Sequence, residues 1–186
     1  MRRFSVILDA CVLYPAPLRD SLMRLSQTDL FKARWTDEIS EEWMRNLEGR
    51  IPRAKLETTR LLMEKNALDV KVDGYEYLID ILELPDPNDR HVLAAAIHSK
   101  ADAIVTFNQK DFPEGYLKQF DVELIHPDDF IVYQFEFNVS KVLECFKNQR
   151  LSLKNPPLSI DEFINGLYKQ QLPQTATMLN EYRDLI

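Results

Sequence analysis

Residues 84–107 read LPDPNDRHVLAAAIHSKADAIVTF, and this stretch indicates the fold class. It opens with a proline-marked loop, and the apolar run at 92–97 then predicts a packed helix over about 89–100. The β-branched segment 103–107 that follows predicts a buried strand. A helix joined to a strand in this way is the unit from which mostly parallel sheets are built.

The same alternation of strand and helix runs through most of the chain. We expect strands at 4–8, 32–35, 103–107 and 121–124, with the first, third and fourth at the centre of the sheet. We expect helices at 17–31, 37–48, 52–67, 74–84, 89–100 and from about 126. Later in the chain the pattern changes to three short helical segments, at 139–152, 159–171 and 175–186. We therefore predict an α/β domain over residues 1–136 and a C-terminal helical extension over residues 137–186.

The bulk composition describes an ordinary globular protein and excludes some kinds of site. The chain has 186 residues, of which 45% are apolar and 28% charged, which suits one domain with a small appendage. The four glycines are too widely spaced for a GxGxxG motif or a phosphate-binding loop, so the usual nucleotide-binding sites are excluded. A net charge of −7 argues against unspecific coating of nucleic acid but leaves room for a local basic groove.

The start of the chain and its cysteines bear on location. The first apolar segment, 4–8, is interrupted by Asp9 and is too short for a signal peptide or a membrane span. Cys11 and Cys145 lie too far apart in the sequence to indicate a disulfide framework, so we interpret both as core thiols in a reducing compartment. We therefore expect a cytoplasmic protein without a membrane segment.

Oxygen-bearing side chains stand at the ends of two predicted strands. Asp9 follows the first strand, and Thr106, Asn108 and Asp111 lie at or just beyond the end of the strand 103–107. The carboxyl ends of parallel strands meet at one edge of a sheet, where open α/β folds bind their ligands. Asp and Asn also favour turns, so these residues have a purely structural alternative.

Another candidate acid lies on the helix 37–48. The apolar residues of this helix share one face, and Glu42 lies at the edge of that face, with Asn46 one turn later beside it. Glu42 is therefore the acid of this helix that we expect to be half buried. The alternative is a surface glutamate paired with Arg45 or Arg50.

Two carboxylates stand at the start of the helix 89–100. Asp86, followed by Pro87, has the form of an ordinary helix cap. Asp89 either complements the helix dipole or shares a cation with the other acids. Carboxylates crowded at one edge repel one another, and a divalent cation removes that conflict. Because all the candidate ligands are oxygen atoms, the cation that suits them is Mg²⁺ or Mn²⁺.

Four segments resemble the PIN domain family, the metal-dependent nuclease fold of VapC-type toxins. They are VILDACVLYP (6–15), ISEEW (39–43), LPDPNDRHVLAAAI (84–97) and DAIVTFNQKDF (102–112), and the resemblance covers about residues 1–130. The third segment is similar to a bacterial branch of the family that carries a helical C-terminal extension. The resemblance implies a three-layer α/β/α fold around a central, mostly parallel sheet.

The resemblance also implies a Mg²⁺- or Mn²⁺-dependent endoribonuclease that hydrolyses RNA phosphodiester bonds, as the toxin of a type II toxin–antitoxin pair. Asp9, Glu42 and Asp89 match the three nearly fixed acids of the family. The more variable fourth position falls on Asn108 or Asp111, and an asparagine there brings no charge. All five are implied metal ligands, and the four acids are the implied catalytic residues.

Neighbouring residues are expected to support this site. Thr106 is expected to hydrogen-bond Asp9, and Asn46 to lie at the edge of the site. Arg90 or His91 would meet a phosphate, unless both belong to a solvent-facing helix start.

RNA, an antitoxin protein and a second copy of the chain in a homodimer are the expected partners. Residues 45–65 hold six Arg or Lys against three Glu, an excess that suits either an RNA groove or a solvated helix face. Two other functions stay open. The substitution at Asn108 allows a non-catalytic binding module with a degenerate metal site. A phosphatase with Asp9 as nucleophile would require a second Asp where Cys11 stands.

Overall fold

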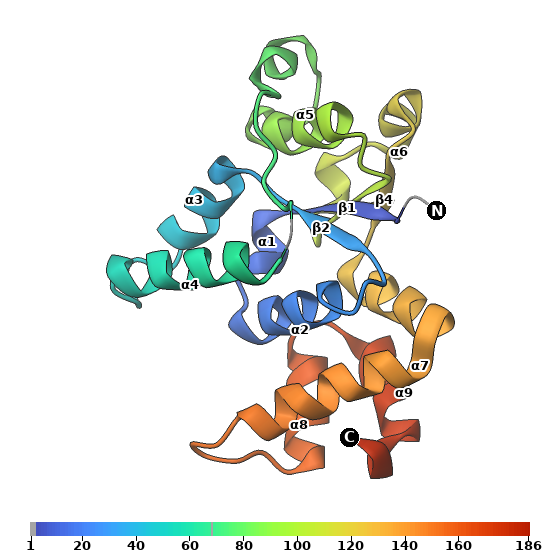
Figure 1. Ribbon diagram of the computed structural model, residues 1–186. Helices are drawn as coiled ribbons and strands as arrows, with labels where there is room; N and C mark the ends of the chain where they lie inside the picture. The colour runs from blue at the N-terminus through green and yellow to red at the C-terminus, as the bar shows by residue number, and fades with distance from the viewer. Residues whose placement is uncertain (1–2, 68) are drawn as a thin grey trace.

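The computed structural model describes residues 3–67 and 69–186, and at its centre lies a four-stranded parallel sheet (Figure 1). The strands are β1 (Ser5–Leu8), β2 (Lys32–Arg34), β3 (Ala103–Val105) and β4 (Glu123–Ile125), in the order β2-β1-β3-β4. All three strand pairs are parallel, and Ile7 of β1 lies opposite Arg34 and Ile104. The predicted α/β class is confirmed.

Helices cover both faces of the sheet. They are α1 (Ala10–Leu13), α2 (Ala16–Ser26), α3 (Asp37–Arg45), α4 (Arg53–Asn66), α5 (Arg90–Ser99), α6 (Glu114–Leu117), α7 (Pro127–Ser152), α8 (Ile160–Lys169) and α9 (Pro173–Glu181). α5 packs against β1 and β3 on one side, and α2 and α7 lie on the other (Figure 1). The three-layer α/β/α arrangement is therefore confirmed. Because β1 and β3 are covered on both faces, their residues are buried throughout, as continuous apolar strands require.

Two predicted elements differ from the structure. The strand expected at 121–124 begins two residues later, because Asp121 takes a left-handed turn with φ of 57°. β4 then lies at the edge of the sheet and not at its centre. The helix expected at 74–84 is only a short 3₁₀ turn, Glu76–Ile81. None of its residues is fully buried, and only Leu78 and Ile79 pack against the core, which is too little apolar contact to hold a longer regular helix.

The C-terminal helices are anchored to the α/β domain by buried polar contacts. Asp128, at the start of α7, accepts the backbone N–H of Thr175 at 2.9 Å and that of Gln174 at 2.8 Å, and so caps α9. Ser21 of α2 donates to Gln149 of α7 at 2.8 Å. These contacts fix the extension against the domain.

α7 joins the two parts of the chain. It is interrupted only at Asn138, whose backbone is non-helical, so the first of the three predicted C-terminal helices continues the helix that leaves the sheet. The boundary expected between residues 136 and 137 falls beside this kink, and it stays a prediction.

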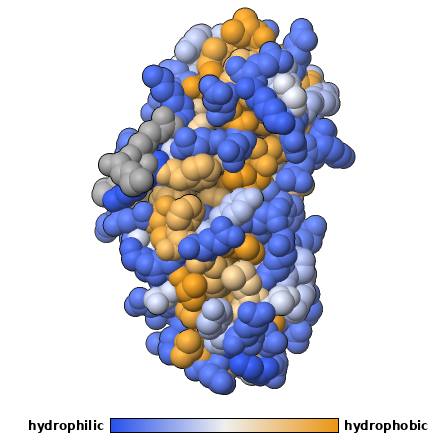
Figure 2. Space-filling view, turned by 90° about the vertical axis from the view of Figure 1, so that its right-hand side faces the viewer, coloured by the Kyte–Doolittle hydropathy of each residue, from blue (hydrophilic) through white to orange (hydrophobic). Residues whose placement is uncertain are grey.

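Within residues 3–67 and 69–186, no helix is long and apolar enough to cross a membrane. The face of the molecule in Figure 2 carries apolar residues in a broken band between hydrophilic ones. Large exposed apolar side chains in the described chain include Phe137 and Tyr133, one turn apart on α7.

Candidate active site

Asp9 is the centre of the candidate site. It follows β1, and its backbone N–H donates to the carbonyl of Val105 on β3 at 3.2 Å. Its Oδ1 accepts the N–H of Ala10 at 2.6 Å, and its Oδ2 accepts from the hydroxyl of Thr106 at 2.7 Å and from the thiol of Cys11 at 3.2 Å. The side chain is buried, which raises the pKa of Asp9 despite the hydrogen bonds from Thr106 and Cys11. Oδ2 is saturated by these donors, so Oδ1 keeps the lone pair that a further ligand would use.

The end of β3 links Asp9 to Asp89. The Thr106 hydroxyl that donates to Asp9 also accepts the backbone N–H of Asn108 at 2.9 Å. The side-chain amide of Asn108 donates to Oδ2 of Asp89 at 3.4 Å. The hydrogen bond predicted between Thr106 and Asp9 is present, and Asn108 extends it to a second acid.

Asp86 and Asp89 do different things at the start of α5. Asp86 accepts the backbone N–H of Asn88 at 2.9 Å, so its predicted capping role is confirmed. Asp89 makes no capping hydrogen bond to the helix. Burial, and then the neighbouring carboxylates, of which Asp9 acts most strongly, raise the pKa of Asp89 to about 7. Asp89 therefore lies among other carboxylates and does not cap the helix.

Glu42 faces a histidine. Its Oε2 lies 3.6 Å from Nε2 of His91, and no ion pair with Arg45 or Arg50 exists among the described residues. Glu42 is half buried, as predicted, and the alternative of an arginine-paired surface glutamate is not found. His91 is only 6% exposed, and neither a solvent-facing position nor a phosphate contact matches this burial. Burial lowers the pKa of His91, but the carboxylates of Glu42 and Glu38 outweigh that effect and raise it overall.

Three other predicted residues lie at the margin of the site. Asp111 is half buried in the 3₁₀ turn Gln109–Asp111, near enough to Asp89 to contribute to the rise in its pKa. Arg90 is half buried, and its Nε has no hydrogen-bond partner among the described residues. Asn46 is exposed at the end of α3, and no described side-chain contact brings it to the acids.

Cys11 belongs to the site, although its sequence suggested a core thiol. It is half buried, and its sulfur lies 3.2 Å from the Thr106 hydroxyl as well as from Asp9. Burial, and then the charge of Asp9, raise the pKa of Cys11 to about 12, which keeps it a neutral donor. The sequence signal that could have placed Cys11 in the site is its position two residues after Asp9, at the start of a helical turn. Cys145 is buried, as predicted.

The donor set fits a hard divalent cation. Among the described residues, no three His, Cys, Asp or Glu side chains already stand at the spacing of one metal ion. The donors that converge are nevertheless carboxylate and amide oxygens, the ligands that Mg²⁺ and Mn²⁺ prefer. The pKa of Asp89, raised by burial and by its acidic neighbours, is the mark of a crowded carboxylate that a cation would relieve.

Ion pairs occupy part of the basic stretch predicted at 45–65. Arg53 bonds Glu41, Glu48 and Glu57, and Arg60 bonds Glu57 and Glu64. These arginines hold α4 against α3 and are not available to an RNA backbone. Only the arginines and lysines of this stretch that lie outside the network carry positive charge that RNA could meet.

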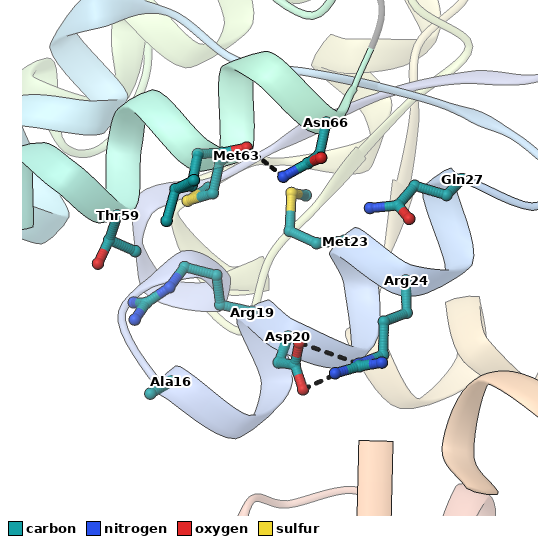
Figure 3. A pocket seen from close by; sticks show the side chains of 10 residues that line it. Ala16, Arg19, Asp20, Met23, Arg24, Gln27, Thr59, Met63 and Asn66 are labelled. Atoms are coloured by element: carbon teal, nitrogen blue, oxygen red, sulfur yellow. Dashed lines mark hydrogen bonds and ion pairs between the residues drawn. The ribbon is translucent and has the colours of Figure 1, made fainter. Parts of the chain in front are cut away.

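A pocket of about 440 Å³ lies between α2 and α4 (Figure 3), but none of the candidate acids lines it. Arg19 is on its wall and is buried, with its guanidinium donating to the carbonyl of Leu13 at 2.6 Å and lying over the ring of Trp43. Asp20 and Arg24 pair with each other one turn apart on α2 (Figure 3). These contacts are structural, so the pocket is separate from the candidate active site.

Comparison with known proteins identifies the family. The profile described as PIN domain matches residues 5–110, more than half of the chain. The chain belongs to the PIN domain family. The profile described as VapC50 C-terminal domain matches residues 127–181, so both parts of the chain have known relatives. Asp9, Glu42, Asp89 and Asn108 lie inside the matched PIN segment, and Asp111 lies just beyond it.

One curated relative is similar over part of its length. A Mycobacterium tuberculosis protein named "Putative ribonuclease VapC50" is 35% identical to this PIN domain chain over 88 residues. The match covers 47% of the chain and 52% of the relative, so it spans about half the length of that protein. The comparison with solved structures found no match.

Proposed function

We propose that this PIN domain protein is a Mg²⁺- or Mn²⁺-dependent endoribonuclease and the toxin of a toxin–antitoxin pair. The observation that carries the proposal is the convergence of Asp9, Asp89 and Glu42 from separate parts of the chain. Their mutual charge contributes, after burial, to the raised pKa of Asp89. The relative named a ribonuclease supports the same activity for this chain.

Each acid has a defined task in this mechanism. Asp9 offers the free lone pair of Oδ1, while Thr106 and Cys11 hold its other oxygen. Asp89 adds a second carboxylate, and Asn108 or Asp111 adds a third ligand. A bound Mg²⁺ or Mn²⁺ would supply Lewis acidity at a phosphoryl oxygen and lower the pKa of water.

Glu42 and Arg90 act on the reacting groups. Glu42 orients the attacking water and accepts its proton, because its half-exposed carboxylate faces both the buried acids and solvent. Arg90 follows Asp89 directly, so its half-buried side chain carries the guanidinium nearest in sequence to Asp89 for binding the scissile phosphate.

RNA would approach over the basic residues that no described carboxylate pairs within 4 Å. Outside the Arg53 and Arg60 network, these are Arg45, Arg50, Lys55 and Lys65. Arg50 also donates to the hydroxyl of Tyr14 at 3.3 Å, which combines a cation with an aromatic ring able to stack on a base. An antitoxin and a second copy of the chain would use exposed apolar side chains such as Phe137.

The test is RNA cleavage by the full chain with and without MnCl₂. We expect metal-dependent cleavage that EDTA stops and that Asp9→Asn reduces at least 100-fold, since the metal site loses its central charge. Asp80→Asn, the same change at an exposed position, serves as the matched control. If the wild-type protein binds no Mn²⁺ by calorimetry, or Asp9→Asn cleaves as well as wild type, the alternative of a non-catalytic binding module is favoured.

A further inference from the structure

One buried histidine joins the two helices that carry candidate acids. His91 is the second residue of α5 and lies two positions after Asp89. Its Nε2 is 3.6 Å from Oε2 of Glu42, and its Nδ1 is 3.7 Å from Oε2 of Glu38. Glu38 and Glu42 stand one turn apart on α3, so one imidazole faces both carboxylates.

The mechanism above leaves this imidazole without a task. Within the described part of the chain, Nδ1 of His91 is buried and has no hydrogen-bond partner. A buried polar ring is costly unless acceptors face its nitrogen atoms, and the carboxylates of Glu38 and Glu42 are the acceptors in reach. The histidine is therefore held where it is by the two glutamates.

The two glutamates differ in what else restrains them. Glu38 also accepts a hydrogen bond from the buried Tyr75 at 3.2 Å. Among the described residues, His91 is the only basic side chain within 4 Å of Glu42, whose side chain is 45% exposed. A long, half-exposed glutamate samples several rotamers, so a single buried partner decides where its carboxylate points.

We propose that His91 is a positioning residue that orients the carboxylate of Glu42 for the metal site. The inference rests on the proposed function, because it requires a divalent cation near Asp9. Nε2 engages Oε2 of Glu42 and leaves Oε1 free for the metal or its water. Because His91 sits two residues after Asp89, the same contact fixes the spacing between two of the acids.

Mn²⁺ binding to the full chain, measured by titration calorimetry, tests this role. Groups that orient metal ligands typically change the affinity 10- to 100-fold, so we expect His91→Leu to weaken Mn²⁺ binding at least about 10-fold. His91→Gln keeps a side-chain N–H donor and should stay within about threefold of wild type. His98→Leu makes the same change at an exposed position of the same helix and should bind as wild type does.

A double-mutant cycle separates positioning from a general loss of structure. In the Glu42→Gln background, His91→Leu should cause no further loss of affinity, because the carboxylate that it orients is gone. Equal losses in both backgrounds, or wild-type affinity of His91→Leu, would overturn the inference. Thermal unfolding in EDTA shows whether each variant folds, and His91→Met replaces His91→Leu if the latter does not.

The wild-type titration distinguishes this inference from the proposed function. If the wild-type chain binds no Mn²⁺, the proposed function fails and the role of His91 fails with it. If the wild-type chain binds Mn²⁺ and His91→Leu, or His91→Met in its place, binds it equally well, the proposed function stands and only the role of His91 is overturned.

Discussion

Replacing Asp89 by Asn tests whether its carboxylate stabilises α5 or is held ready for a cation. Burial first, and then the neighbouring carboxylates, raise the pKa of Asp89 from 3.8 to about 7. The folded protein therefore binds this proton more tightly than the unfolded chain. The stability associated with the protonated form is fully present below about pH 4 and is lost as the pH rises through about 7.

The structure sets the size of the effect. A pKa raised from 3.8 to about 7 corresponds to at most about 4 kcal/mol of lost stability. Asp89 is only half buried, and solvent screens much of that interaction, so we expect about 1–2 kcal/mol. In metal-free buffer at pH 8, Asp89→Asn should be more stable than wild type by that amount. At pH 4 most of the difference should vanish, because the wild-type carboxyl is then largely protonated in the folded protein.

Urea unfolding in EDTA at pH 4 and pH 8 measures this difference, and Asp86→Asn is the matched control. Asp86 accepts the backbone N–H of Asn88, and an asparagine oxygen accepts it equally well, so this replacement should change the free energy of unfolding by only about a few tenths of a kcal/mol at both values. A helix-dipole role for Asp89 predicts the opposite sign, a loss of about 0.3–1 kcal/mol on replacement at pH 8. A destabilised Asp89→Asn variant would therefore refute the reasoning.

Added MnCl₂ should reverse the order of stability. At a concentration 100 times the dissociation constant, a ligand that binds only the folded state stabilises it by about 2.7 kcal/mol. Wild type should gain this amount at pH 8, and Asp89→Asn should gain little, because one charged ligand is gone. Equal gains would show that the ion does not use Asp89.

Three further outcomes are expected. Thr106→Val removes the hydroxyl that donates to Asp9, and should lower RNA cleavage at least 10-fold and the free energy of unfolding by about 1–2 kcal/mol, as measured by cleavage assay and urea unfolding. Asp128→Ala removes the buried cap of α9, and should cost about 2–3 kcal/mol in urea unfolding; an unchanged midpoint would mean that the extension is held by other contacts. Asp111→Asn should weaken Mn²⁺ binding more than Asn108→Ala in calorimetry, because it removes a charge; negligible losses in both would exclude both as the fourth ligand.

Local patterns in the sequence were enough for the fold class and for most elements. The period-2 and period-3.6 patterns are local properties of the chain, and Thr36, Asp86 and Ser159 cap helices through contacts within three residues. The placement of Asp9 and Thr106 at one sheet edge also followed, because parallel strands bring their carboxyl ends together. The helix predicted at 74–84 was wrong because the apolar composition of a segment does not reveal which of its side chains the core will cover.

Only the tertiary structure decided which side chains meet across the site. Cys11 contacts Asp9 and Thr106, and His91 lies beside Glu42 where the alternative had placed an arginine, through pairings between residues up to 95 positions apart. Arg53 and Arg60 also form ion pairs with glutamates of neighbouring turns and helices, and a count of the charges in 45–65 could not reveal these pairs. Side-chain partners across elements depend on helix rotation and packing distance to within an ångström or two, and local sequence patterns carry neither quantity.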